Sequence, residues 1–264
     1  KIFRLWVIIE IMNGELIYVK NSFGISLPGI LIKGTKETKK LFIMSHGRGG
    51  NFFSGLDSFL PTLISVADKN ARDFLGVSDT GAGFFRLYDV FETAADDYKS
   101  WIEFAKIRGY EEIIFGAHSY GPLKIAYYYG QVEPPEIKGL FFLAPSDTYN
   151  IWKNFIGKSS EKYLSLAKKL VDEKNGKKIM PEEAYYNPIS AQSYWSLYGP
   201  ESKLHWKKLM PEIKIPVLTV IGGKDKNKFA PTGSQTVCLE EADNVFTNCN
   251  EKLEKTISSW LNKL

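Results

Sequence analysis

Hydrophobic and polar residues first alternate along the chain and then gather into short apolar runs. The alternation in residues 15–19 and 25–32, separated by a turn, predicts two antiparallel strands. Helical spacing is clearest in residues 89–107, where Gly109 marks the end. Between such helical segments lie the unbroken apolar runs typical of strands buried on both faces, at 41–44, 74–77, 113–115, 140–143 and 217–221. This order predicts an α/β fold with a doubly wound, mostly parallel sheet.

The rhythm stops in the second half of the chain. Residues 148–210 contain an amphipathic helix but no convincing buried strand, and we interpret them as a helical cap inserted into the core. The core then comprises residues 12–147 and 211–264. Residues 1–11 precede Met12, a plausible natural start, and we expect them to be an N-terminal extension. Aromatic side chains are frequent in the cap, where we expect most to pack and a minority to line a pocket: Tyr149, Trp152, Phe155, Tyr185, Tyr186, Tyr194, Trp195, Tyr198 and Trp206.

Composition narrows the classes of function. With 44% hydrophobic residues the chain is globular, and its 34 Lys and Arg against 30 Asp and Glu leave a charge of +4, too small to indicate nucleic acid. No apolar run reaches the roughly 20 residues needed to span a membrane. Cys238 and Cys249 lack the spacing of a zinc site or a disulfide framework. We therefore expect a cytoplasmic protein that binds a small molecule, with no metal and no cofactor.

The segment around Ser119 carries the strongest chemical signal. It lies between a predicted buried strand and a predicted helix, and it reads Ala117-His118-Ser119-Tyr120-Gly121. A sharp strand-to-helix turn requires small residues two positions either side of its apex, as Ala117 and Gly121 provide. Such a turn presents the serine hydroxyl above the sheet and directs backbone N–H groups toward an oxygen that becomes negative.

With these residues the chain resembles the α/β-hydrolase superfamily over about residues 15–264. Its nucleophile motif G-x-S-x-G corresponds to residues 117–121, with Ala in place of the first Gly. Residues 46–50 are similar to the family's oxyanion loop, so the resemblance implies oxyanion donors at the backbone N–H groups of Arg48 and Tyr120. It also implies that Asp225 is the acid, with Asp147 as the alternative.

The resemblance fails at the base. In the family a histidine precedes the final helix, whereas the corresponding stretch here reads Ala242-Asp243-Asn244. Asn244 occupies the histidine slot, and an amide cannot accept the proton of Ser119. A natural loss, an engineered substitution and a misalignment all remain open. We expect structural roles for His46 and His118, and a route into the pocket for His205 only if the cap folds over it.

Other nucleophile schemes fit the sequence less well. A serine–lysine pair using Lys226 or Lys228 requires a desolvated lysine, but both lie in a strongly polar run. The two cysteines would also lack a base. The glycine-rich segments do not have the spacing of a phosphate-binding loop.

Two hypotheses follow. The first is a serine hydrolase that cleaves carboxylic esters through an acyl-enzyme on Ser119 and is impaired by Asn244. The second is a non-catalytic α/β-hydrolase-like protein that binds a small acyl or aromatic ligand under the cap. Restoring a histidine at position 244 distinguishes them, because only an enzyme should gain activity. The sequence does not identify the substrate or the oligomeric state.

Overall fold

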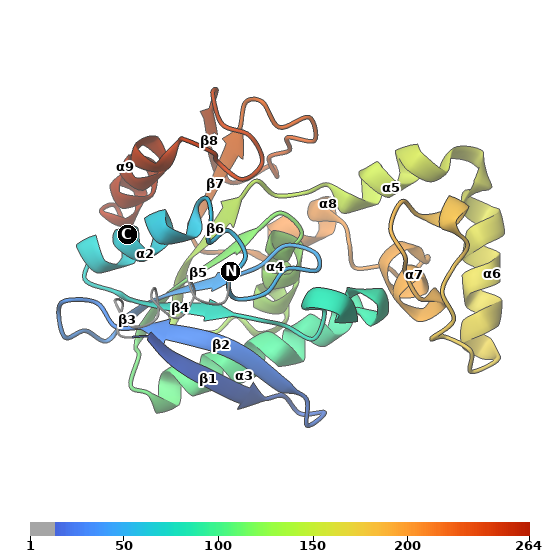
Figure 1. Cartoon of the computed structure of the whole chain (residues 1–264), viewed down its shortest axis with the longest axis horizontal. Helices are drawn as coiled ribbons and strands as arrows, with labels where there is room; N and C mark the ends of the chain where they lie inside the picture. The colour runs from blue at the N-terminus through green and yellow to red at the C-terminus, as the bar shows by residue number, and fades with distance from the viewer. Residues whose placement is uncertain (1–13) are drawn as a thin grey trace.

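One eight-stranded sheet forms the centre of the computed structural model, which describes residues 14–264 (Figure 1). The order across the sheet is β1-β2-β4-β3-β5-β6-β7-β8, and β2 runs antiparallel to both of its neighbours while all other pairs are parallel. The predicted mostly parallel α/β sheet is therefore confirmed, whereas the extension expected at residues 1–11 lies outside the described residues. The strands are β1 (Gly14–Lys20), β2 (Ser26–Ile32), β3 (Lys40–Ser45), β4 (Asp73–Val77), β5 (Glu112–His118), β6 (Ile137–Leu143), β7 (Val217–Gly222) and β8 (Gln235–Leu239).

Helices cover both faces of this sheet. Helices α2 and α9 pack together on one face, and α3 and α4 pack together on the other (Figure 1). Four further helices, α5 to α8, lie between β6 and β7 in the sequence. The α-helices are α2 (Leu60–Lys69), α3 (Ala94–Ile107), α4 (Gly121–Val132), α5 (Thr148–Ile156), α6 (Ser160–Asp172), α7 (Ala191–Tyr198), α8 (Trp206–Leu209) and α9 (Asn250–Leu261).

The strands alternate their side chains between two hydrophobic cores. In β3, Leu41 and Ile43 belong to the core beneath α3 and α4, whereas Phe42 and Met44 belong to the core beneath α2 and α9. All four are at most 4% exposed, which explains why the strand reads as one unbroken apolar run. The alternation follows from the two-residue period of a strand.

One predicted helix starts later than expected. The apolar spacing from residue 89 predicts a helix over 89–107, but α3 begins at Ala94 after a single 3₁₀ turn at Phe91–Thr93. Val90 is extended, the carboxylate of Asp89 is bound to Lys124, and the N–H of Phe91 donates to the hydroxyl of Ser196. These tertiary contacts hold residues 89–91 outside the helix.

The segment between β6 and β7, residues 144–216, forms a helical insertion. Helices α5, α6 and α7 lie together at one end of the molecule, on the right of Figure 1. Aromatic packing joins them, since the rings of Trp152 and Tyr198 stack at 4.5 Å and the indole N–H of Trp152 donates to the hydroxyl of Tyr194 at 2.9 Å. The insertion follows the carboxyl end of β6, the edge of the sheet where ligands bind in open α/β folds.

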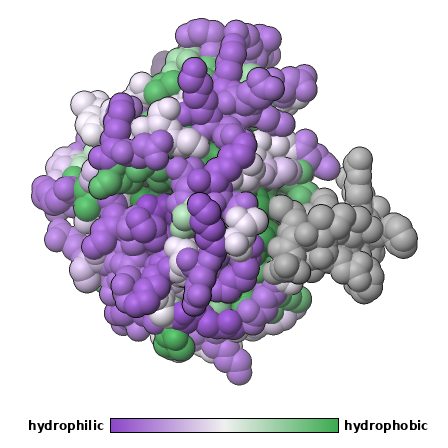
Figure 2. All heavy atoms as spheres, turned by 90° about the vertical axis from the view of Figure 1, so that its left-hand side faces the viewer, coloured by the Kyte–Doolittle hydropathy of each residue, from purple (hydrophilic) through white to green (hydrophobic). Residues whose placement is uncertain are grey.

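The opposite end of the molecule is mostly polar. Figure 2 shows that hydrophilic residues cover most of this face, with small hydrophobic areas between them. Among residues 14–264, no helix has both the length and the apolarity that crossing a membrane requires.

Candidate active site

Ser119 lies at the apex of a strained turn between β5 and α4. Its φ of +57° falls in the left-handed region that side chains rarely adopt. A Cβ at Gly121 would collide with the carbonyl oxygen of His46 and would come within 2.9 Å of the Cβ of Ala117. Glycine is therefore required two residues after the serine, and a small residue two before it. This geometry is that of a nucleophile elbow.

The loop after β3 lies directly against this turn. A Cβ at Gly47 would come within 3.0 Å of the Cβ of Ser119. His46 fixes the loop, because its Nδ1 donates to the carbonyl of Gly47 at 2.7 Å and its Nε2 accepts the N–H of Asp79 at 3.2 Å. The role of His46 is thus structural, as the sequence predicted.

Two backbone N–H groups beside Ser119 have no acceptor. Within the described residues, neither the N–H of Arg48 nor that of Tyr120 takes part in a hydrogen bond. At the other end of the loop the backbone N–H of Gly50 has an acceptor, because it donates to the carbonyl of Gly47 at 3.0 Å. Two free donors next to a serine are the arrangement that stabilises an oxyanion.

Asp225 and Asn244 meet at the carboxyl ends of β7 and β8. The Nδ2 of Asn244 donates to the Oδ2 of Asp225 at 2.7 Å. The two loops approach closely, because a Cβ at Gly222 would clash with the carbonyl oxygen of Asp243, and the N–H of Lys224 donates to the carbonyl of Ala242 at 2.9 Å. Asn244 therefore makes the contact with an aspartate that a histidine would make in a catalytic triad.

His118 holds the loop that carries Asn244. Its Nε2 donates to the backbone carbonyl of Asn244 at 2.9 Å, and its ring packs against Phe59. Burial lowers the pKa of His118, which keeps the imidazole neutral. The sequence suggested a structural role for His118 but gave no sign of this contact across 126 positions.

Asp147, the alternative acid, is engaged elsewhere. Its carboxylate caps α5 and accepts the side-chain amide of Asn150 at 2.6 Å. His205 packs its ring on that of Tyr149, with 4.1 Å between the ring centres. The structure thus pairs Asp225, and not Asp147, with Asn244.

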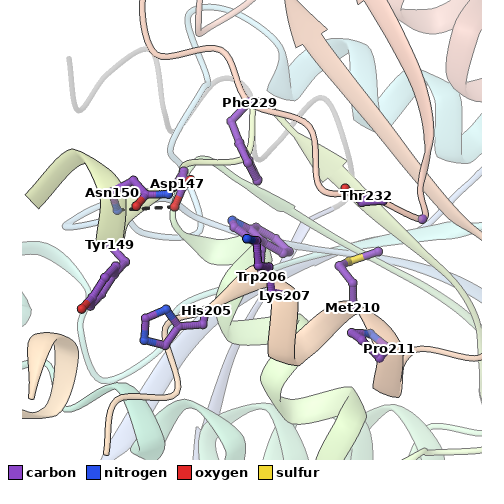
Figure 3. A pocket seen from close by; sticks show the side chains of 11 residues that line it. Asp147, Tyr149, Asn150, His205, Trp206, Lys207, Met210, Pro211, Phe229 and Thr232 are labelled. Atoms are coloured by element: carbon purple, nitrogen blue, oxygen red, sulfur yellow. Dashed lines mark hydrogen bonds between the residues drawn. The ribbon is translucent and has the colours of Figure 1, made fainter. Parts of the chain in front are cut away.

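A pocket of about 670 Å³ lies between the helical insertion and the loop after β7, and its lining does not include Ser119, Asp225 or Asn244 (Figure 3). The N–H of Ser146 donates to the carbonyl of Ser119 at 2.8 Å, and the indole N–H of Trp206 donates to the carbonyl of Ser146 at 3.0 Å, so a pocket wall is two bonds from the elbow. The lining residues come from the end of β6, the helical insertion and the loop after β7: Asp147, Tyr149, Asn150, His205, Trp206, Lys207, Met210, Pro211, Phe229, Thr232 and Gly233.

A buried ionic cluster of Lys124, Asp79 and Asp89 contacts the loop after β3 through His46. The ammonium group of Lys124 lies 2.8 Å from Asp79 and 2.9 Å from Asp89, and all three side chains are at most 3% exposed. Burial alone would raise the pKa of Asp79, but Lys124 outweighs it and lowers the pKa to about 2. The backbone N–H of Asp79 also binds His46 and so helps to hold the loop after β3. The sequence showed no sign of this cluster, whose members come from distant segments.

The remaining alternatives from the sequence lie apart from Ser119. Lys226 and Lys228 are exposed, and Lys228 donates to the carbonyl of Gly223. Cys249 is buried in the core beneath α2 and α9, and Cys238 is partly exposed. Both cysteines are free thiols.

Comparison with known proteins agrees with this geometry at the level of fold. Residues 91–206 match a family model described as a protein of unknown function (DUF1749), and no curated protein sequence matches the chain. The chain is similar to Est1E from Butyrivibrio proteoclasticus, solved with ferulic acid bound, with a TM-score of 0.70 and 15% identity over 94% of this chain and 98% of that one.

Two esterases of known structure are also similar. The Pyrococcus furiosus esterase Pf2001 has a TM-score of 0.63 and 14% identity, over 97% of this chain and 93% of its own. The esterase EaEST from Exiguobacterium antarcticum has a TM-score of 0.60 and 17% identity, over 93% and 98%. The chain therefore has the α/β-hydrolase fold, and the fold that the resemblance implied is confirmed.

Proposed function

We propose that this protein is a serine hydrolase that cleaves carboxylic esters through an acyl-enzyme on Ser119. The observation that carries the proposal is the strained turn at Ser119, with the unpaired N–H groups of Arg48 and Tyr120 beside it. Neighbours of the same fold that are described as esterases support the reaction class.

In this mechanism the Oγ of Ser119 attacks the ester carbonyl carbon. The carbonyl oxygen becomes negative and accepts hydrogen bonds from the N–H groups of Arg48 and Tyr120. Collapse of the intermediate breaks the bond to the alcohol, which leaves with a proton, and the acyl group stays on the serine. Water then attacks the acyl-enzyme, releases the acid and returns the proton to Ser119.

The proposed mechanism lacks a general base that could accept the proton of Ser119. Asn244 is held by Asp225 but has no basic nitrogen, so the proton of Ser119 must pass to water. Serine proteases that lose a triad member keep an acceleration of roughly 10³ to 10⁴ over water. We therefore expect weak but measurable hydrolysis by the chain as it stands.

The pocket between the helical insertion and the loop after β7, linked to Ser119 by the hydrogen bonds of Ser146, is the place we assign to the apolar part of the substrate. Trp206, Phe229 and Tyr149 give it aromatic walls suited to an apolar or aromatic group. In this proposal residues 148–210 act as a cap over the site. The Est1E structure with ferulic acid shows that a protein of this fold can hold an aromatic acid.

Restoring the base tests the proposal. The variant Asn244→His should raise kcat/KM on p-nitrophenyl acetate and butyrate at pH 8 by roughly 10² or more, because the imidazole can take the proton while Asp225 orients it. Adding Ser119→Ala should remove the gain. The exposed Asn262→His is the matched control and should change nothing. A folded Asn244→His variant without gain on any ester of an aromatic and short-chain panel would contradict the proposal.

A second function is favoured by one observation. Asn244 is bound on two sides, through its amide to Asp225 and through its backbone carbonyl to His118, so the site is well ordered without a titrating base. A protein that binds a small acyl or aromatic ligand without cleaving it would have such a site. In such a protein Ser119 would serve as a polar anchor that hydrogen-bonds the ligand, and Asn244→His would bring no activity.

A further inference from the structure

The side chain of Arg48 is the first element of a site that the ester-cleaving geometry does not use. Its Nη1 donates to the hydroxyl of Tyr185 at 3.1 Å, but its Nη2 is buried and has no acceptor. Among residues 14–264, no carboxylate lies within 4 Å of the guanidinium. An arginine stays charged at every physiological pH, so a buried positive charge is left without a direct partner.

Two phenol hydroxyls near Arg48 also lack a hydrogen-bond partner. The OH groups of Tyr120 and Tyr198 are buried without a partner, and the residues are 2% and 1% exposed. Both lie around Arg48: its guanidinium carbon is 6.0 Å from the ring centre of Tyr120 and 4.8 Å from that of Tyr185, and the ring of Tyr185 packs 5.7 Å from that of Tyr198. Burial raises the pKa of both phenols well above the ordinary value, so both are neutral and able to donate.

The nearest negative charge that acts on Arg48 is already in use. Asp89 influences the guanidinium at longer range, but Lys124 lies 2.9 Å from each of its two oxygens. Buried polar groups in folded proteins are nearly always hydrogen-bonded. Three unpaired donors around one buried cation therefore indicate a missing acceptor, and the acceptor that satisfies them all is an anion.

We propose that Arg48, Tyr120 and Tyr198 form a subsite that binds a carboxylate group of the substrate. Arg48 and Tyr120 are also the residues whose backbone N–H groups lie beside Ser119, so the same two residues would contact both the carboxylate and the reacting carbonyl. A guanidinium binds a planar carboxylate through two parallel hydrogen bonds. The inference rests on the proposed function and narrows it: the substrate is an ester that also carries a carboxylate, such as a half-ester of a dicarboxylic acid.

Calorimetric titration tests the subsite without relying on catalysis. The unmodified chain at pH 8 is titrated with glutarate, with its neutral diamide and with inorganic phosphate. Glutarate should bind and the diamide should not. Arg48→Gln should weaken glutarate binding about tenfold or more, and Tyr198→Phe should weaken it severalfold. Arg108→Gln, which removes the same charge from an exposed pair with Glu15, should leave it unchanged.

The outcomes separate the anion classes. Binding of phosphate but not of glutarate through Arg48 would overturn the carboxylate assignment. Equal glutarate affinity in Arg48→Gln, or no binding of either anion, would overturn the subsite itself. Arg48→Gln shortens a packed side chain, so Arg48→Lys is measured beside it. Lysine keeps the charge but not the planar pair of donors, and the variant should bind glutarate with intermediate affinity.

Kinetics then distinguish failure of the subsite from failure of the proposed function. In the Asn244→His background, a mono-p-nitrophenyl glutarate should be preferred over p-nitrophenyl butyrate by about tenfold, and Arg48→Gln should erase this preference. Glutarate binding that depends on Arg48 without any hydrolysis would reject the esterase and keep the subsite. Hydrolysis without a preference for the ester that carries a carboxylate would keep the esterase and reject the subsite.

Discussion

Two cationic side chains, the buried Lys124 and the partly buried Arg48, lie near the ring of Tyr120, and they differ in their partners. The ammonium of Lys124 is 5.2 Å from the ring centre and the guanidinium of Arg48 is 6.0 Å from it. Lys124 is bound by two carboxylates, whereas Arg48 has only the hydroxyl of Tyr185. A buried charge that stabilises the fold is paired with opposite charges of the same chain. A charge that binds a ligand keeps unpaired hydrogen-bond donors for that ligand.

The largest effect expected from this contrast is the loss of Lys124. Lys124→Met leaves Asp79 and Asp89 buried without a counter-charge, so the free energy of unfolding should fall by about 3 to 5 kcal/mol. Urea unfolding followed by circular dichroism measures it. Lys168→Met is the matched control, because Lys168 and Asp172 are 55% and 59% exposed and loss of their pair should lower the free energy of unfolding by about 1 kcal/mol or less. Equal losses in the two variants would remove the distinction.

The free energy of unfolding should depend on pH through Asp97, a buried carboxylate whose pKa is raised by burial and by the charge of Asp79 in the paired cluster. Burial, and secondly the charge of Asp79, raise the pKa of Asp97 to about 6 from an ordinary value of 3.8. The folded state therefore holds this proton more tightly than the unfolded state. The contribution of Asp97 to stability is fully present below pH 3.8 and is lost as the pH rises through 6, a loss of about 3 kcal/mol.

Asp97→Asn should flatten the decline in unfolding free energy between pH 4 and pH 7. The amide also loses one of the bonds that Asp97 accepts from Asn21 and Thr80, so the variant should be less stable at pH 4. Urea midpoints across this pH range measure both effects. An unchanged slope in the variant would show that Asp97 is ionised throughout.

The smallest effect is expected at the unpaired cation. Arg48→Met removes a buried charge that has no carboxylate partner, so the free energy of unfolding should stay within about 1 kcal/mol of the original or increase. Its melting temperature without ligand, compared with that of Lys124→Met, gives the answer. A loss as large as that of Lys124→Met would assign Arg48 to the fold instead of to a ligand.

Local patterns predicted most of the fold. The unbroken apolar runs located β3, β5 and β6, because these strands are buried on both faces over the run, whereas in β7 the buried Thr219 stands between apolar residues. The predicted start of α3 was five residues too early. The contacts of Asp89 and Phe91 with distant residues keep this stretch out of the helix although the apolar spacing continues through it.

At the candidate site, the sequence by itself determined the small residues around Ser119 and the amide at position 244, because each depends on a short stretch of chain. The tertiary structure decided what these residues meet. It placed Asp225, and not Asp147, against Asn244, and it brought the guanidinium of Arg48 to the hydroxyl of Tyr185, 137 positions away. Such contacts depend on how whole elements pack, and no local spacing encodes the free hydrogen-bonding capacity of a buried arginine.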